Sequence, residues 1–251
     1  MEVRNYIPEL ENVSETLLVP LFFKAKETME NGIVKDNAAV EIIRKIQYDF
    51  RKMAQDRDTQ FVIALRTQIL DKIVGEYVNQ TEHSVIVNLG AGLDTRHLRF
   101  DDSVKWYQLD LKQPMRLRSL FFNQESTDIT KSILDFSWIE DVREKENVLI
   151  IIEGVLMYLD ETQVKSIFKA IGQHFRNSYI AFDTIPETYV NMKKHQCIDM
   201  KQAPFKWGNH SLSEIERWGY GLQKVKNHYY LSENYLTDKM RGFKVSVMKI
   251  N

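Results

Sequence analysis

Cysteine is almost absent from this sequence: Cys197 is the single one among 251 residues. One cysteine can form neither an internal disulfide nor a cysteine-based zinc site, which is typical of a protein from a reducing compartment. Proline and glycine are also scarce, with five and ten residues. No repeat or low-complexity tract occurs. The chain therefore lacks the composition of a disordered protein or of domains joined by a linker.

An excess of one charge and long apolar runs are missing as well. The 34 Lys and Arg residues balance 35 Asp and Glu residues, and the net charge of −1 excludes the basic surface of a nucleic-acid-binding protein. The longest early apolar run, Leu17 to Phe23, is too short to span a bilayer, and no signal-peptide core precedes it. We expect a cytoplasmic globular protein that contacts neither nucleic acid nor membrane.

Residues 1–80 have the periodicity of helices. In the clearest segment, 61–78, apolar residues recur at every fourth position: Phe61, Leu65, Ile69, Ile73 and Tyr77. This spacing predicts a helix with one wide apolar face. Arg66 and Asp71 lie off the centre of that face, toward a cleft or solvent. We interpret residues 1–80 as a helical N-terminal cap.

Short apolar runs rich in β-branched residues follow residue 80. Four of them predict buried strands, at 84–89, 104–109, 148–152 and 179–182. After the third run, Asp160 and Gln163 have the spacing of a capping box at the start of a helix. Strands that alternate with helices predict an α/β fold with a doubly wound sheet.

The last part of the chain departs from this alternation. Residues 225–231 and 243–249 predict two strands with no long helix between them, so we expect an antiparallel pair at the end of the sheet. Residues 186–220 have weaker periodicity and predict a lid or substrate insert. The core domain would thus cover residues 81–251 and carry this insert.

Glycines and acids follow the predicted strands. The first strand ends in Gly90-Ala91-Gly92, and others end at Asp110, Glu153 and Asp183. Ligands of open α/β sheets bind at the carboxyl ends of the strands. Asp110 lies twenty residues after Gly90, the spacing at which an acid accepts hydrogen bonds from ribose hydroxyls. This spacing indicates an adenosine-type ligand.

The glycine loop favours S-adenosylmethionine over a dinucleotide. Thr95 occupies the position of the third glycine in a dinucleotide fingerprint. Asp94 adds a negative charge that would repel a pyrophosphate but would suit the ammonium group of a methionine moiety. Asp94 could equally be a helix N-terminal acid stabilised by the macrodipole, and both interpretations stay open.

Four motifs carry a family resemblance: VNLGAGLDTR, WYQLD, SILDFSW and IIEGVLMYL. Together they resemble the leucine carboxyl methyltransferase superfamily, and within it the bacterial tetracenomycin-type polyketide O-methyltransferases. Likeness in the N-terminal helices and in the late segment FKWGNHSLSEIERW extends it over nearly the whole chain. In the stretch PLFFKAKET this chain has Lys24 and Lys26 where the branch often has arginines.

The resemblance implies a Rossmann-like class I methyltransferase sheet that binds S-adenosyl-L-methionine. By motif, Arg66 would pair with the cofactor carboxylate, and Glu153 would lie near its amino group. Gly90 and Gly92 would let the backbone approach the methionine part. The remaining cofactor-binding candidates are Asp110 with Leu111 at the ribose, and Asp135 and Phe136 at the adenine.

No residue stands out as a catalytic base, and no histidine spacing indicates a metal. His210 and His228 are candidate bases, and Tyr158 could line the acceptor site or only pack its ring. We therefore predict an O-methyltransferase that acts mainly by proximity on a carboxylate or phenolic hydroxyl of a small molecule. The alternatives are a protein C-terminal carboxyl methyltransferase and a non-catalytic cofactor-binding protein. The oligomeric state cannot be inferred from the sequence.

Overall fold

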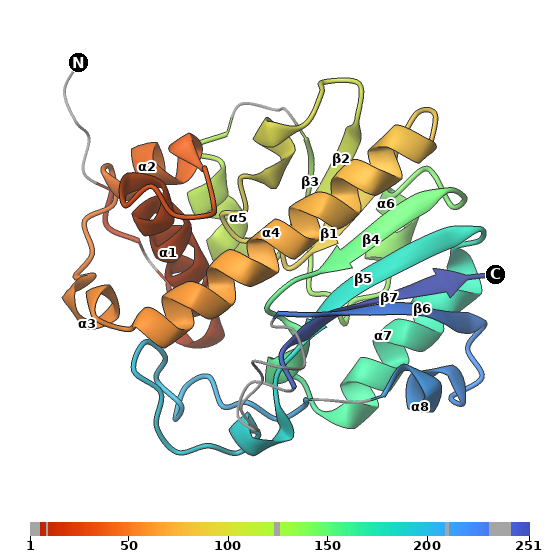
Figure 1. Cartoon of the computed structure of the whole chain (residues 1–251). Coiled ribbons are helices and arrows are strands. Elements are labelled where there is room, and N and C mark those ends of the chain that lie inside the picture. Colours follow the sequence, from red (N-terminus) through yellow and green to blue (C-terminus); the bar gives the residue numbers. More distant parts are fainter. Residues whose placement is uncertain (1–5, 9, 123–125, 209–210, 231–241) are drawn as a thin grey trace.

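The computed structural model describes residues 6–8, 10–122, 126–208, 211–230 and 242–251 (Figure 1). In this part of the chain seven strands form one sheet in the order β3-β2-β1-β4-β5-β7-β6. The strands are β1 (Val85–Leu89), β2 (Lys105–Asp110), β3 (Thr127–Thr130), β4 (Val148–Ile152), β5 (Ser178–Thr184), β6 (Leu222–Tyr229) and β7 (Lys244–Ile250). β7 runs antiparallel to both β5 and β6, and the other pairs are parallel. The predicted doubly wound sheet with an antiparallel C-terminal pair is confirmed.

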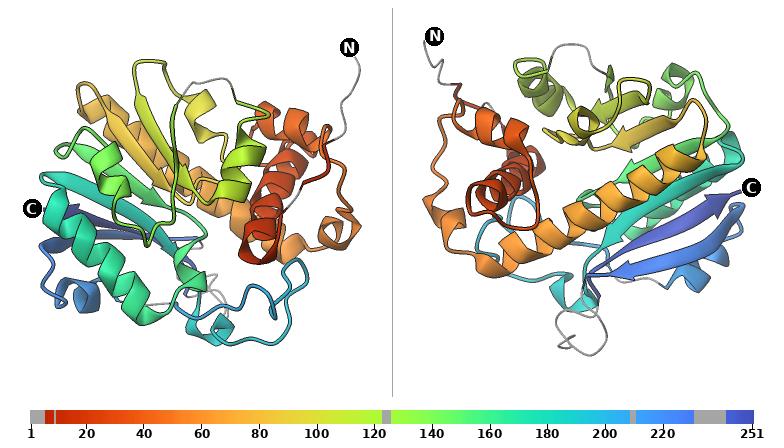
Figure 2. Two further views of the ribbon diagram at one scale, coloured as in Figure 1. Left: turned by 180° about the vertical axis from the view of Figure 1, so that it is seen from behind. Right: turned by 45° about the horizontal axis from the view of Figure 1, so that its top comes forward.

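Helices cover both faces of this sheet (Figure 2). The helices are α1 (Leu18–Met29), α2 (Asn37–Ile43), α3 (Arg51–Ala54), α4 (Arg57–Gln80), α5 (Lys112–Arg118), α6 (Trp138–Asp141), α7 (Glu161–His174) and α8 (Leu212–Glu216). Alternate residues of β1 pack to opposite faces: Val85 and Val87 join α6 and α7, whereas Ile86 joins α4. Both faces are therefore apolar, as in a buried parallel sheet.

The α7 helix begins as the sequence predicts. Asp160 accepts a hydrogen bond from the Gln163 N–H at 2.9 Å, and the Gln163 side chain accepts one from the Asp160 N–H at 3.0 Å. The apolar face beyond this capping box, including Ile167 and Phe168, packs against the sheet. This helix therefore packs against β4, whose carboxyl end leads into the predicted site.

The buried face of the α4 helix differs from the predicted one. Phe61, expected at the centre of the apolar stripe, is 43% exposed, whereas Arg66 and Thr67 are buried. The lower half of α4, including Leu70 and Val74, packs directly on the sheet. By packing, α4 is thus also a layer that covers one face of the sheet.

Three further features of the fold differ from or add to the sequence predictions. The segment after the glycine loop is one 3-10 turn, Arg96–Arg99, where a helix was expected. The short strand β3 has no apolar run and was not predicted. Within the predicted insert 186–220, Leu212 and Ile215 of α8 are core residues.

None of the helices described is long and apolar enough to cross a bilayer.

Candidate active site

A cavity of about 680 Å³ opens at the carboxyl ends of β1, β2 and β4. Its wall combines α1, the start of α4, the glycine loop, residues 131–134 and parts of 185–205. The β1 and β4 strands are adjacent, yet their crossovers lead to opposite sides of the sheet. The cavity therefore lies at the topological switch point where such sheets bind ligands.

The glycine loop lines this cavity with bare backbone. Gly90 has φ +80°, and a Cβ there would lie 2.2 Å from Val155 Cγ2. Gly92 has φ +47°, and a Cβ there would lie 3.2 Å from Leu17 Cβ. Both positions need glycine, because the left-handed backbone and the close neighbours disfavour any side chain. A ligand can therefore approach the peptide groups of this loop.

Asp110 closes the loop from the neighbouring strand. Its Oδ2 accepts a hydrogen bond from the Gly92 N–H at 2.7 Å, and its Oδ1 accepts one from the Leu111 N–H at 2.7 Å. Burial raises the pKa of this carboxyl, while the two N–H donors oppose the rise. Asp110 and Leu111 both line the cavity.

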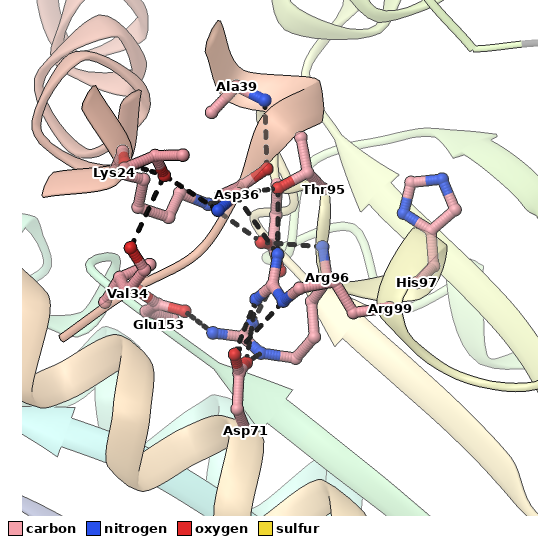
Figure 3. A network of polar contacts seen from close by, with 12 residues as sticks. Lys24, Val34, Asp36, Ala39, Asp71, Thr95, Arg96, His97, Arg99 and Glu153 are labelled. Atoms are coloured by element: carbon pink, nitrogen blue, oxygen red, sulfur yellow. Dashed lines mark hydrogen bonds and ion pairs between the residues drawn. The ribbon is translucent and has the colours of Figure 1, made fainter. Parts of the chain in front are cut away.

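A buried ion network lies behind the loop (Figure 3). Arg96 is fully buried and bridges Asp71 at 2.7 Å, Asp94 at 2.6 Å and Glu153 at 2.8 Å. Three carboxylates around one guanidinium fix the glycine loop to α4 and to the end of β4. Such a network is stabilising only while every member keeps its partners.

Arg66 extends the network toward the cavity. Its guanidinium pairs with Glu153 at 2.9 Å and with Asp183 at 2.9 Å. Arg66 and Glu153 both line the cavity. Burial opposes ionisation of Glu153, but the charges of Arg96 and Arg66 prevail and lower its pKa. Two residues that the sequence assigned to the cofactor thus form one ion pair.

Asp94 is likewise engaged by cations. Its Oδ1 accepts a hydrogen bond from Lys24 Nζ at 3.0 Å, and Arg96 contacts its Oδ2. Burial opposes ionisation, yet these cations hold the pKa of Asp94 well below its usual range. The element that follows Asp94 is one short 3-10 helix, Arg96–Arg99, and the printed contacts of the Asp94 carboxylate include Lys24 and Arg96. Lys24, which the sequence left without a role, lines the cavity beside it.

Asp135 and Phe136 lie away from the cavity wall. Asp135 is exposed, and its carboxylate accepts a hydrogen bond from the Ser137 N–H at 3.2 Å, which lowers its pKa. Phe136 packs against the core. Their neighbours Ile133 and Leu134 line the cavity instead.

We predict that Asp135→Ala changes the dissociation constant of S-adenosylhomocysteine by less than about twofold, because exposed polar contacts contribute little free energy. Isothermal titration calorimetry measures this directly, with the unsubstituted protein as the reference. A tenfold weaker affinity would contradict this prediction and would support the contact between Asp135 and the adenine that the motif implies.

Tyr158 is the residue that the sequence suggested for the acceptor site. It lines the cavity, and its ring centroid is 5.5 Å from that of Phe205. Burial raises the pKa of its hydroxyl to about 12, so the group is protonated and cannot act as a base at neutral pH. His228 lies on β6 outside the cavity lining, and His210 lies outside the described residues.

The structure also brings together Asp56, His195 and Cys197, which the sequence did not connect. Their ligand-type atoms lie within 4.8 Å of one another, at the start of α4 and in the segment that covers it. Asp56 and Cys197 are 141 residues apart, so no local spacing could have indicated the cluster. Of the three residues, His195 lines the cavity.

His97 is linked to the glycine loop through Arg118. It is 5% exposed, and Nη2 of Arg118 lies 3.4 Å from its ring nitrogens. Arg118 in turn donates to the carbonyl oxygens of Gly92 and Asp94. Burial and the Arg118 charge lower the His97 pKa to about 4.

This depressed pKa predicts a loss of stability in mild acid. Below pH 6.5 the unfolded state gains a proton on His97 that the folded state does not, so stability falls as the pH drops toward 4. The His97 share of the loss between pH 7 and 4.5 is about 2–3 kcal/mol. Urea unfolding at several pH values checks this. Between pH 7 and 4.5, the free energy of unfolding of His97→Gln should fall by about 2–3 kcal/mol less than that of the unsubstituted protein. An equal fall in both proteins would contradict the depressed pKa of His97.

The sequence profile of the leucine carboxyl methyltransferase family matches residues 19–172. That span holds the glycine loop, Asp110, Arg66 and Glu153 on one continuous stretch of the chain. The chain belongs to the leucine carboxyl methyltransferase family. The sequence-based assignment to this methyltransferase family is thus confirmed.

Two relatives resemble the chain over most of its length. The tetracenomycin polyketide synthesis O-methyltransferase TcmP of Streptomyces glaucescens is 26% identical over 91% of this chain and 87% of its own. The S-adenosyl-L-methionine-dependent methyltransferase dpfgK of Gibberella zeae is 25% identical over 90% of this chain and 85% of its own.

Solved structures support the fold of this leucine carboxyl methyltransferase family member. A Thermobifida fusca structure superposes with a TM-score of 0.64 at 14% identity, covering 96% of this chain and 95% of its own. The magnesium protoporphyrin IX methyltransferase of Synechocystis PCC 6803 superposes with a TM-score of 0.56 at 10% identity, covering 92% of this chain and 100% of its own.

Proposed function

We propose that this methyltransferase transfers a methyl group from S-adenosyl-L-methionine to a hydroxyl oxygen of an aromatic small molecule. The observation that carries the proposal is one cavity in which bare glycine backbone, the Asp110 carboxylate and a buried ion network meet. Each of these features fits a different part of the cofactor.

The charge of the network fits a cationic cofactor. Among the described residues it joins four cations to five carboxylates, which leaves one negative charge in excess when all five are ionised; burial raises the pKa of one of them, Asp183, and the charge of Arg66 opposes this rise. The cations are Lys24, Arg66, Arg96 and Arg99, and the anions are Asp36, Asp71, Asp94, Glu153 and Asp183. S-adenosylmethionine carries a sulfonium, an ammonium and a carboxylate, and therefore a net charge of +1. An excess of carboxylates beside the cavity favours a ligand of the opposite sign.

The residues in the cavity suggest how the cofactor would be held. Arg66 and Lys24 would meet its carboxylate, and Glu153 its ammonium group. Asp110 and Leu111 would hold the ribose beside the Gly90–Gly92 backbone. For the adenine we propose Ile133 and Leu134, because Asp135 and Phe136 lie outside the cavity wall.

When bound, the cofactor supplies a methyl group on a positively charged sulfur. The chain contributes enclosure and positioning: aligned reactants can gain roughly 7–11 kcal/mol from proximity, and a water-poor site favours dispersal of the sulfonium charge. The described cavity wall suits this role, because most of its residues outside the ion network are apolar.

The acceptor end of the cavity is rich in aromatic rings. We use this term for Tyr158, Ile185, Tyr189, His195, Phe205 and Phe243, which all line the cavity. Flat apolar walls favour a planar aromatic acceptor. The relative TcmP is named as an O-methyltransferase of tetracenomycin polyketide synthesis, which supports oxygen as the methylated atom and a polyketide-like molecule as the acceptor.

Thermal unfolding tests the cofactor. At about 100 times its dissociation constant, S-adenosylhomocysteine should add about 2.7 kcal/mol and raise Tm by roughly 5–10 °C. NADH at the same concentration should leave Tm unchanged. A shift with NADH alone would overturn the proposal in favour of a nicotinamide cofactor.

Product analysis then tests the acceptor. Labelled methyl on a protein band without a small-molecule product would favour a protein carboxyl methyltransferase. Cofactor binding without turnover over a broad panel of phenols and carboxylic acids would favour a non-catalytic protein.

A further inference from the structure

His195 lies in the segment that covers the acceptor end of the cavity. This segment is fastened to the start of α4: the Cys197 thiol donates to Asp56 Oδ2 at 3.1 Å, and Asp56 also accepts from the Thr59 N–H at 3.0 Å. The His195 ring packs edge-on against Phe205, with centroids 6.0 Å apart. Its position is therefore set by contacts on both sides.

The hydrogen bond from Cys197 to His195 determines which ring nitrogen of His195 carries the proton. The backbone N–H of Cys197 donates to Nδ1 at 3.1 Å, so Nδ1 must keep its lone pair. In the neutral ring the proton then lies on Nε2. Burial lowers the pKa of the ring, which favours this neutral form. Because Nδ1 is occupied, Nε2–H is the polar group that His195 can offer to a molecule in the cavity.

We infer that His195 determines acceptor specificity by donating a hydrogen bond from Nε2–H to an oxygen of the aromatic acceptor. The inference rests on the proposed function and specifies its substrate class. The acceptor would be a planar ring system with an oxygen that accepts a hydrogen bond at the acceptor end of the cavity. In this role His195 is a positioning donor. It does not remove the acceptor proton, because a nitrogen that already carries hydrogen has no lone pair for it. The phenol would bind as the phenolate after losing its proton to water, and Nε2–H would donate to an acceptor oxygen that keeps its lone pairs.

Two amide substitutions test the roles of the two ring nitrogens separately. In His195→Gln the side-chain amide NH₂ reaches the place of Nε2–H, so the donor toward the acceptor is kept and the bond from Cys197 is lost. In His195→Asn the amide oxygen reaches the place of Nδ1, so the bond from Cys197 is kept and the donor is lost. Neither amide can take up a proton at neutral pH.

The probe is emodin, a planar hydroxyanthraquinone. Its dissociation constant is measured by fluorescence in the presence of saturating S-adenosylhomocysteine, and its methylation is followed with S-adenosylmethionine. We expect His195→Asn to weaken emodin binding and to raise KM about 3- to 10-fold, the effect of one lost neutral hydrogen bond. His195→Gln should stay within about twofold of the unsubstituted protein in both measurements.

Other outcomes overturn the inference. Equal loss of kcat in both variants would make His195 a general base. Normal binding in His195→Asn with loss in His195→Gln would give the ring a purely structural role through Cys197. Calorimetric binding of zinc ions in the absence of emodin, lost in His195→Gln, would make Nδ1 a metal ligand. If S-adenosylhomocysteine binds the unsubstituted protein but emodin does not, this inference fails while the cofactor assignment stands.

Discussion

Replacing Asp110 with alanine is expected to weaken S-adenosylhomocysteine binding about 10- to 150-fold. The carboxylate lies in the cavity with both oxygens oriented by the N–H groups of Gly92 and Leu111. A hydrogen bond to a charged acceptor contributes about 1.5–3 kcal/mol, and the ribose would lose such a bond. The substitution also removes the contact that holds the Gly92 peptide in place.

Calorimetric titration of the cofactor product measures this effect. Asp101→Ala is the matched control, because Asp101 is an exposed acid that caps the Ser103 N–H and does not line the cavity. The control should bind with an unchanged dissociation constant. Equal weakening in both variants would reduce the role of Asp110 to general electrostatics.

The second large effect is expected on stability. Arg96→Met removes a fully buried guanidinium and leaves Asp71, Asp94 and Glu153 without their shared cation. Breaking a buried charge network from one side costs about 3–5 kcal/mol, because the remaining charges stay desolvated. For a chain of this length Tm should fall by roughly 6–20 °C.

Arg44→Met provides the comparison for this prediction. Arg44 pairs with Glu41 on the surface, with both side chains more than half exposed, and such pairs contribute about 0–1 kcal/mol. Urea unfolding followed by circular dichroism should separate the two variants clearly. If Arg96→Met unfolded within 1 kcal/mol of the unsubstituted protein, the network could not be what fixes the glycine loop.

The elements with a strong local signal could be predicted from the sequence. The apolar run 148–152 and the capping box at Asp160 and Gln163 are determined by neighbours close along the chain. The loop Gly90–Gly92 and Asp110 follow from strand ends and spacing, because parallel strands bring their carboxyl ends together. The sequence therefore predicts that these residues belong to the site.

Long-range contacts account for what the sequence did not predict. Arg96 had no evident role, because its partners Asp71 and Glu153 lie far from it along the chain. The same holds for Lys24 beside Asp94 and for His195 beside the start of α4. Phe61 was placed in the apolar face because periodicity cannot show that α4 buries Arg66 for its ion pairs.

Methyl transfer to emodin with trideuteriomethyl-labelled S-adenosylmethionine tests the central claim most directly. Mass spectrometry and NMR of the small-molecule product should show the labelled methyl on a phenolic oxygen, formed together with S-adenosylhomocysteine. Label found only on nitrogen, carbon or a protein, or no label transferred to any phenol by a protein that binds the cofactor, would contradict an aromatic O-methyltransferase.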